Sequence, residues 1–458
     1  MIEKAIEPLY ATARPNDSIL LFRECDLELR TPWLIFGKGK TELWWAPTKA
    51  VRFELDSIAG TNEHAFESLV FDFLTFGSLP AILNVPTIPP MSWDVIITKA
   101  NIPLLSGNLG GLIRKTRLNG DDEAQCDELK FHIVNLDNFI GTSVMYPSKN
   151  LWPRRIVLSD DKWEITIDGV ENLEELIKGL DQEGGFAITH VGVLKQRCKK
   201  PFKVTDAIEQ MGTLGNFLSF VEGRWCFPIL LVGTRKGEIV FRDLSARRRI
   251  DQWKGNWRWS PMLAKYLDDA YKGFASKWND PKWRKTVATI LEFYTRANTY
   301  PTVELSVLDS FTALDRLASA YSLEEVTPAS KRIRQALAKG GLNNQSPEKE
   351  LYTFYEDFYK KYFPSKSADC ATILTDFRNG VVHGNRFIKP NDKWCRPKLD
   401  DDGDRSNPPV PSEIKSEARQ LGLWCVEMSL LYLIGYNGLY NDRLTGVQDV
   451  QIHWSKPK

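Results

Sequence analysis

Apolar residues in the C-terminal part of the chain recur every three or four positions, the spacing that buries one face of a helix. The longest stripe predicts a helix from Thr302 to Tyr321 and consists of Val303, Val307, Phe311, Leu314, Ala318 and Tyr321. Helix start and stop residues predict further helices from Pro281 with Asp280 as N-cap, from Pro328 to Gly340, from Pro347 to Pro364, from Ser367 to His383 and from Ser412 to Gly435. Residues 280–458 are therefore expected to form an all-α bundle of normal domain size, preceded by a connecting segment at 261–279.

The first 260 residues show a different pattern, in which apolar and polar residues alternate with a period of two. This alternation predicts strands at Leu129–Ile133, Trp163–Ile167 and Ile239–Phe241. Turn-forming residues at 159–162 and 234–237 suit hairpins, so antiparallel sheets are expected, interrupted by helices near 170–180 and 205–211. The chain is predicted to be an α+β protein with a β-rich N-terminal region, residues 1–260, long enough for two lobes that would divide near 119–124.

The most informative motif is RNGVVHG at Arg378–Gly384, because it sets an Arg, an Asn and a His within six residues. These are the groups that metal-free RNA cleavage needs. His383 could accept a proton near neutral pH, Arg378 could hold a phosphate through its bidentate fork, and Asn379 could orient either of them. Among the five His of the chain, only His383 has an Arg five residues before it. Arg378, Asn379 and His383 are therefore the candidate catalytic residues.

Regular helix geometry separates the charged groups of this motif. Asn379 and His383 would share one face, whereas Arg378 and His383 would lie about 140° apart around the axis. Either the backbone distorts at Gly380, or the site combines groups from two facing copies of the segment. In a third interpretation, the His only caps the helix dipole, and Arg378 pairs with Asp376 or with a neighbouring helix.

A helical bundle whose penultimate helix ends in FRNGVVHG resembles the HEPN superfamily, and within it the ApeA-like group of bacterial proteins implicated in defence against phage. The resemblance covers residues 280–440, and its signature of Arg, a polar residue, three variable positions and His is matched by residues 378–383. The segment 214–233 is also similar to the stretch that closes the N-terminal domain of that group. The resemblance implies an RNA endonuclease with its site in a cleft between two protomers, and a sensing or regulatory role for residues 1–260.

The same resemblance implies a role in abortive infection, in which cleavage of host tRNA or other RNA arrests translation after a phage-derived trigger. His383 would act as general base on the ribose 2′-OH, which attacks the adjacent phosphorus and leaves a 2′,3′-cyclic phosphate. Arg378 would stabilise the charged phosphorane, and Asn379 would orient His383 or the phosphate. No cofactor or metal is expected, and the expected partners are RNA and a second copy of the chain. Two rival functions are a non-catalytic dimerisation module and a nucleic-acid-binding adaptor.

Composition narrows the class of protein rather than its chemistry. The 458 residues are 43% hydrophobic and 26% charged, which is ordinary for soluble globular domains. The 60 basic side chains balance 59 acidic ones, so any RNA contact is expected to be local. No signal peptide opens the chain, Glu427 interrupts the apolar stretch 421–440, and seven irregularly spaced Cys suit reduced thiols. These features predict a cytoplasmic protein that makes no use of the membrane.

Two basic clusters leave alternatives open. The segment 247–259 contains three consecutive Arg and three Trp, whose rings could stack on bases or pack between domains. On the predicted helix that follows Pro328, Lys331, Arg332 and Arg334 could extend a basic track towards the cleft or form a solvated helix face.

Motifs for metal or nucleotide chemistry are poorly represented. The acidic loop at 400–404 does not fit an EF-hand, because Lys398 occupies the first ligand position and no Glu follows at the required distance. P-loop, GxSxG and HExxH signatures are absent from the sequence, which argues against the common NTPase and hydrolase classes.

Overall fold

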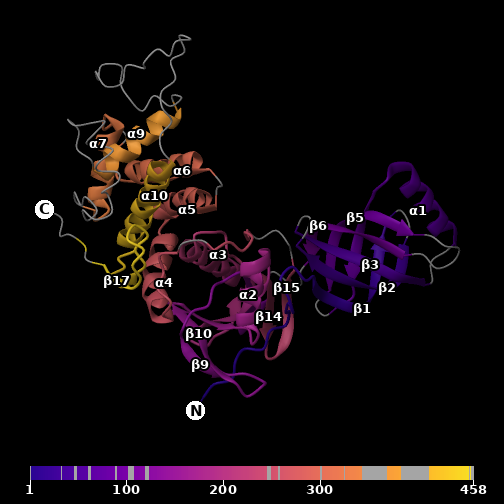
Figure 1. Cartoon of the computed structure of the whole chain (residues 1–458). Helices are drawn as coiled ribbons and strands as arrows, with labels where there is room; N and C mark the ends of the chain where they lie inside the picture. Colours follow the sequence, from indigo (N-terminus) through magenta and orange to yellow (C-terminus); the bar gives the residue numbers. More distant parts are fainter. Residues whose placement is uncertain are drawn as a thin grey trace, which may run out of the picture. The chain divides into compact units, whose positions relative to one another are not determined.

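The computed structural model covers residues 1–458, and Figure 1 labels many of its elements. It describes residues 2–31, 34–45, 49–59, 63–87, 90–101, 108–118, 123–244, 249–255, 258–299, 302–323, 325–342, 369–382, 412–452 and 454. The described part of the chain divides into two compact units, of which the first contains Met1–Gly215 and Cys226–Gly255 and the second contains Asn216–Trp225 and Asn256–Lys458. The prediction of an α+β protein, β-rich in its N-terminal region and helical in its C-terminal half, is confirmed.

Within the described residues of the first unit, six strands form a closed antiparallel barrel in the order β1-β2-β3-β6-β5-β4. These strands are β1 (Ile19–Arg30), β2 (Leu34–Trp44), β3 (Ala50–Ala59), β4 (Leu79–Val85), β5 (Met91–Asn101) and β6 (Asn108–Leu118). Alternate side chains point inward, and buried Leu29, Phe53, Trp93 and Ile97 are among those that fill the interior. Helix α1 (Glu63–Phe76) connects β3 to β4.

The sequence predicts none of these barrel strands individually, and β2 shows the reason. Its buried positions include Gly37, Gly39 and Thr41, so small or polar residues occupy the inward face and hide the alternation of apolar side chains. Close packing of backbones explains one of these glycines, since a Cβ atom at Gly39 would lie 2.1 Å from the backbone oxygen of Glu54 on β3.

In the described remainder of the first unit, seven strands form an antiparallel sheet in the order β15-β14-β8-β12-β11-β10-β9. They are β8 (Glu128–Val134), β9 (Thr142–Met145), β10 (Leu151–Ser159), β11 (Trp163–Gly169), β12 (Ile188–Gln196), β14 (Pro228–Arg235) and β15 (Glu238–Asp243), beside a small pair of β7 (Gln125–Cys126) and β13 (Phe202–Lys203). The three strands predicted in this region correspond to β8, β11 and β15, and both predicted turns join antiparallel neighbours. The division between two β-rich lobes is expected near 119–124. The last barrel strand ends at Leu118 and β7 begins at Gln125, and residues 119–122 lie outside the described residues.

The first residues of the chain pair with one edge of this sheet. The amide of Ala5 donates to the carbonyl of Met145 on β9 (2.9 Å), and the amide of Met145 donates to the carbonyl of Glu3 (2.9 Å). The edge of β9 is therefore covered by a further length of backbone.

On the next two strands, β10 and β11, Arg155 donates two hydrogen bonds to the fully buried carboxylate of Asp168 (2.8 and 2.7 Å).

Helices α2 (Leu173–Glu183) and α3 (Val204–Glu222) accompany the sheet. The helix predicted at 205–211 is too short, because α3 continues through Gly212 and Gly215 to Glu222. Glycine in a helix costs ~1 kcal/mol relative to alanine and favours a stop in an isolated segment. Burial of side chains such as Phe217 and Phe220 outweighs that cost and extends the helix.

The second unit is helical in its described part, with a small C-terminal hairpin. Its elements are α4 (Ala264–Asn279), α5 (Pro281–Thr299), α6 (Val303–Ala320), α7 (Ala329–Lys339), α9 (Cys370–Val382), α10 (Ser412–Leu433), β16 (Leu439–Tyr440) and β17 (Val450–Gln451). Predicted helices correspond to α5, α6, α7, α9 and α10, whereas the helix predicted from Pro347 to Pro364 lies outside the described residues. Asp280 caps α5 as expected, because its Oδ1 accepts a hydrogen bond from the amide of Lys282 (2.9 Å).

The segment 261–279, expected only as a connection, contains the buried helix α4. Its apolar stripe, spaced by three and four residues, consists of Leu267, Tyr271, Phe274 and Trp278. The stripe packs on the end of α3, where the ring centroids of Phe217 and Tyr271 lie 5.1 Å apart. Phe217 is distant from α4 in the sequence. The helix start and stop residues near 261–279 therefore do not indicate that α4 belongs to the core of the second unit.

Among the described elements, α9 packs against α6, α7 and α10. Its buried side chains include Cys370, Ala371, Ile373, Leu374 and Phe377. Gly422 on α10 marks a close approach, because a Cβ atom there would lie 2.8 Å from the Cβ of Ser310 on α6 and 3.4 Å from Leu374 on α9. The position of α9, and hence of the motif at its end, is set by these tight contacts.

Candidate functional site

The predicted catalytic motif begins on the last turns of α9. Nη1 of Arg378 donates a hydrogen bond to Oδ1 of the adjacent Asn379 (3.0 Å). The guanidinium carbon of Arg378 also lies 5.7 Å from the ring centroid of Phe311 on α6. Both polar side chains are half-buried. The structure thus brings Arg378 and Asn379 together, whereas His383 lies outside the described residues.

This arrangement orients a permanent positive charge near the protein surface. A guanidinium carries five N–H groups in one plane, and the bond to Asn379 uses one of them. Contact with the face of Phe311 fixes the plane without neutralising the charge. Two parallel N–H groups of such a guanidinium can bind a phosphate. The end of α9 is open to solvent, since Val382 is 50% exposed.

Two basic residues on α7, Arg332 and Arg334, are paired with carboxylates, whereas Lys331 is exposed. Nε of Arg332 donates to Oδ1 of Asp315 (2.8 Å), and Nε of Arg334 donates to Oδ2 of Asp369 (2.6 Å). Asp369 also caps α9 by accepting the amide of Thr372 (2.9 Å). Burial alone would raise the pKa of Asp369, but hydrogen bonds from Arg334 and Thr372 outweigh it and hold the pKa below its ordinary value. The ion pairs argue against a continuous basic track along α7.

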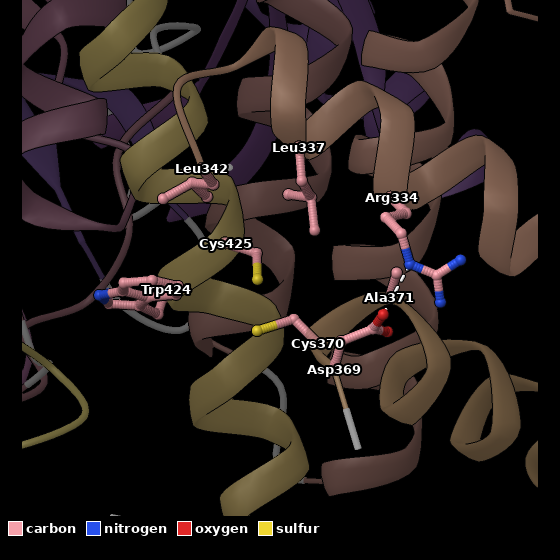
Figure 2. Close-up of a pocket in the computed structure, with 8 residues that line it drawn as sticks. All are labelled: Arg334, Leu337, Leu342, Asp369, Cys370, Ala371, Trp424 and Cys425. Atoms are coloured by element: carbon pink, nitrogen blue, oxygen red, sulfur yellow. Dashed lines mark hydrogen bonds and ion pairs between the residues drawn. The ribbon is translucent and has the colours of Figure 1, made fainter. Parts of the chain in front are cut away.

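A small pocket lies at the opposite end of α9 from the motif. Figure 2 shows the residues that line it: Arg334, Leu337, Leu342, Asp369, Cys370, Ala371, Trp424 and Cys425. They come from α7, the segment after it, the start of α9 and the middle of α10. Because α9 rises ~1.5 Å per residue, Cys370 and Arg378 are separated by roughly 12 Å along the helix axis. The pocket and the Arg378 motif are therefore distinct features.

Tryptophans of the segment 247–259 are core residues where the structure describes them. Trp253 is buried, and its Nε1 donates to Oδ1 of Asp181 (2.9 Å). Trp259 is fully buried, and its Nε1 donates to the carbonyl of Phe220 (3.0 Å). Neither ring is accessible for stacking on a base. Trp257 lies outside the described residues, as do the first two Arg of the segment.

Buried histidines of the first unit have a structural role. Nε2 of His132 accepts hydrogen bonds from the amides of Leu9 (3.2 Å) and Tyr10 (3.1 Å), so the ring proton belongs on Nδ1, which lies 3.3 Å from the carbonyl oxygen of Leu230. Burial lowers the pKa of His132 to about 3, and it lowers the pKa of His190 to about 3 as well. Both rings are inaccessible, which makes them unsuitable as general bases for an external substrate.

The second unit contains a buried ion pair that the sequence signals only through Glu427 in an apolar stretch. Nη2 of Arg443 lies 2.6 Å from Oε1 of Glu427, and both side chains are 2% exposed. Gln420 and Asn298 accept further hydrogen bonds from Arg443 (2.9 and 3.0 Å), and the hydroxyl of Tyr294 donates to Glu427 (2.8 Å). Such a closed network joins α5 and α10 and has no surface for a substrate. None of the described helices, α10 included, is long and apolar enough to cross a membrane.

Metal-ligating side chains do not converge in the described part of the chain. No group of three His, Cys, Asp or Glu is placed there to hold a metal ion. The acidic residues at 400–404 lie outside the described residues.

Comparisons with known proteins find similarity to YopA domains over two parts of the chain. The model of the YopA central domain matches residues 121–256, and the model of the YopA C-terminal domain matches residues 280–453. The chain is also similar to the SPbeta prophage-derived uncharacterized protein YopA of Bacillus subtilis (strain 168). The two are 25% identical over 420 residues, which cover 89% of this chain and 87% of the relative. No solved structure matches the chain. These similarities extend over both units, and the names of the matched domains and of the relative give no activity.

Proposed function

We propose that the second unit is a HEPN-type domain and that the protein is a metal-independent RNA endonuclease. The observation that carries the proposal is the hydrogen-bonded pair of Arg378 and Asn379 at the solvent-accessible end of a bundle helix, just before His383 in the sequence. The motif supplies an always-charged phosphate-binding group beside a side chain that can titrate near neutral pH. In the proposed reaction, both groups serve the transfer of a phosphoryl group to the 2′-OH of RNA.

In the proposed reaction, His383 removes the proton from the ribose 2′-OH. The oxygen then attacks the adjacent phosphorus, the bond to the 5′-oxygen breaks, and a 2′,3′-cyclic phosphate remains. Arg378 binds the non-bridging oxygens, whose negative charge grows in the transition state, and Asn379 holds the guanidinium in place. The nucleophile belongs to the substrate, so the mechanism does not need a metal ion to generate one.

A second copy of the chain completes the proposed site. On a regular helix, Arg378 and His383 point about 140° apart, so one copy of α9 does not direct both at the same phosphate. Val382, which is 50% exposed between them in sequence, offers an apolar surface on which two helix ends can meet. A two-fold interface would bring two motifs face to face.

The proposed biological role is abortive infection in the bacterial cytoplasm. Cleavage of tRNA or other RNA would arrest translation, and the β-rich first unit would respond to a phage-derived trigger. The support is the ApeA-like character of the motif, together with the prophage origin stated in the name of the B. subtilis relative.

Incubation of the purified protein with RNA, and with DNA of the same sequence, in excess chelator tests the chemistry. We expect RNA to be cut to products with 2′,3′-cyclic phosphate ends and DNA to remain intact, because DNA lacks the 2′-OH. His383→Ala should abolish cleavage. Arg284→Ala is a matched control, because Arg284 lies 5.7 Å over the ring of Trp278, as Arg378 does over Phe311. Equal cutting of DNA, or activity that returns only with magnesium, would contradict the mechanism.

Mixing two inactive variants tests the composite site. If each site takes Arg378 from one copy and His383 from the other, heterodimers of Arg378→Ala and His383→Ala contain one intact site and recover part of the activity. A strictly monomeric enzyme with full activity in sedimentation would rule out the composite site and favour a backbone distortion at Gly380.

A non-catalytic dimerisation module is the second candidate, and the exposed Val382 is the observation that favours it. It predicts dimers that do not cut RNA and whose association is weakened by Val382→Asp. An adaptor that binds nucleic acid through the segment 247–259 is less favoured, because Trp253 and Trp259 are buried.

A further inference from the structure

Two cysteine side chains meet between α9 and α10. Cys370, the first residue of α9, is 6% exposed, and Cys425, in the middle of α10, is 0% exposed. Their side chains are hydrogen-bonded to each other. Figure 2 shows both sulfur atoms facing one another across the gap between the helices. Neither residue is in a disulfide.

The pocket described above gives small molecules a route to this pair. Both cysteines line it, beside Leu337, Leu342 and Trp424. Its cavity volume of about 20 Å³ holds a molecule of about the size of water, and a peroxide is scarcely larger. Cys370 is the less buried of the two residues and is the one that a small oxidant entering the pocket would reach.

The surroundings give the two thiols unequal chemistry. Burial, together with the hydrogen bond to Cys370, raises the pKa of the Cys425 thiol well above its ordinary value. Cys425 therefore remains protonated at neutral pH. Cys370 lies instead at the first position of α9, beside the ion pair of Arg334 and Asp369 that lines the same pocket.

We propose that Cys370 and Cys425 are a redox-active dithiol, which a peroxide closes to a disulfide that links the start of α9 to α10. The Cys370 thiolate attacks one peroxide oxygen, the O–O bond breaks, and Cys370 becomes a sulfenic acid while hydroxide leaves. Sulfur of Cys425 then attacks sulfur of Cys370. The S–S bond forms, the S–O bond breaks, and the departing hydroxide takes the Cys425 proton as water. Two thiols are oxidised and one peroxide is reduced to two waters. This chemistry does not depend on the proposed RNA cleavage.

Three other cysteines of the described residues, Cys126, Cys198 and Cys226, are not adjacent to that pocket. Cys226 is buried and donates to the carbonyl of Val134, and Cys126 is buried in the β-rich unit. Cys198 is exposed on the surface and contacts Gln196. Cys126 and Cys226 are controls for buried thiols, and Cys198 is the control for an exposed thiol.

Peptide mapping of the oxidised full-length protein tests the proposal. Native protein is treated with hydrogen peroxide, remaining thiols are alkylated, and trypsin is added without reductant. Cleavage after lysine and arginine places Cys370 alone in peptide 367–378 and Cys425 alone in peptide 420–443. We expect these peptides as one species, lighter by two hydrogen atoms than their sum, and separable again by dithiothreitol. Cys126 and Cys226 should stay alkylated.

A trapping experiment gives a second readout. In Cys425→Ala, the sulfenic acid on Cys370 has no partner and should be captured by dimedone, which should not label the peroxide-treated wild type at this position. Peroxide that oxidises Cys198 but leaves peptides 367–378 and 420–443 unlinked in native protein would overturn the proposal. A link that forms only after urea is added would do so equally, because it would reflect unfolded chains.

Discussion

Two arginines of the helical unit, Arg443 and Arg378, differ in how their charge is used. Arg443 is 2% exposed and donates to Glu427, Gln420 and Asn298. Arg378 is half-buried and is held by one neutral amide, that of Asn379, and by an aromatic face. The first guanidinium is neutralised inside the protein, whereas the second lies at a helix end that reaches solvent.

This difference separates a residue that the fold needs from one that a ligand would need. A buried ion pair is costly to break because the remaining charge is left without compensation. A partly exposed guanidinium that neutral groups only orient contributes little to stability. Under the proposed function, its charge at the end of α9 binds an anion, the phosphate of the substrate. The predictions below test this division, from the largest expected effect to the smallest.

Removal of Arg443 should have the largest effect. Arg443→Ala leaves Glu427 buried without a counter-charge, so the free energy of unfolding should fall by ~3–5 kcal/mol. Urea denaturation followed by circular dichroism measures it. Arg284→Ala, which removes an exposed arginine from α5, should change it by less than ~0.5 kcal/mol. If the two variants were equally stable, the network around Glu427 would not be the structural anchor that its burial indicates.

Removal of Arg378 should affect cleavage rather than stability. Arg378→Ala should lower the rate of RNA cleavage at least ~100-fold, because a charged donor to the transition state is lost. The free energy of unfolding should change by less than ~1 kcal/mol. Arg378→Lys should recover only part of the rate, since an ammonium does not reproduce the bidentate fork. Unfolding of Arg378→Ala would erase the contrast with Arg443.

Acid should destabilise the protein through His132, which is buried in its uncharged form. The pKa of His132 is about 3 in the folded protein, lowered by burial, and close to 6.5 when unfolded. Between these values the unfolded chain binds a proton that the folded chain does not, so stability is complete above pH 6.5 and falls as pH decreases. At pH 5 this loss is ~2 kcal/mol for one histidine. In denaturant titrations at several pH values, His132→Gln should show a shallower loss than wild type, and an unchanged slope would contradict the assignment.

Loss of Asn379 should have the smallest effect. Its amide oxygen accepts one hydrogen bond from Arg378, so Asn379→Ala removes orientation and leaves the charge. A single hydrogen bond of this kind is worth ~1 kcal/mol, which corresponds to roughly fivefold slower cleavage. Single-turnover rates for wild type and variant measure it. A loss as large as that of Arg378→Ala would mean that Asn379 contacts the substrate itself.

Local signals account for the parts of the fold that were predicted correctly. Helix α6 carries a long apolar stripe, and α5 carries its own cap in Asp280, so both are specified within their own residues. The barrel strands are not specified within their own residues. Inward positions such as Gly39 are small because the backbone of a neighbouring strand lies close to them. Helix α4 likewise depends on Phe217 and Phe220 of α3, which are distant in sequence.

The candidate site divides in the same way. Arg378 and Asn379 are neighbours in the sequence, and this places their side chains within reach of a hydrogen bond. Phe311, which orients the guanidinium, could not be inferred, because it comes from α6 and meets α9 only through tertiary packing. The pairing of Arg443 with Asn298 is similarly non-local, 145 positions apart along the chain.

The closed barrel limits how the N-terminal part can recognise another molecule. Sheets with a free edge can bind an extended peptide by adding a strand, using main-chain hydrogen bonds that hardly depend on side chains. In the barrel, β4 pairs with β1 and satisfies that edge. In the neighbouring sheet, Glu3 and Ala5 already occupy the edge of β9. At these places, recognition must come from side chains and loop shape, so specificity for a partner can change by substitution without altering the fold.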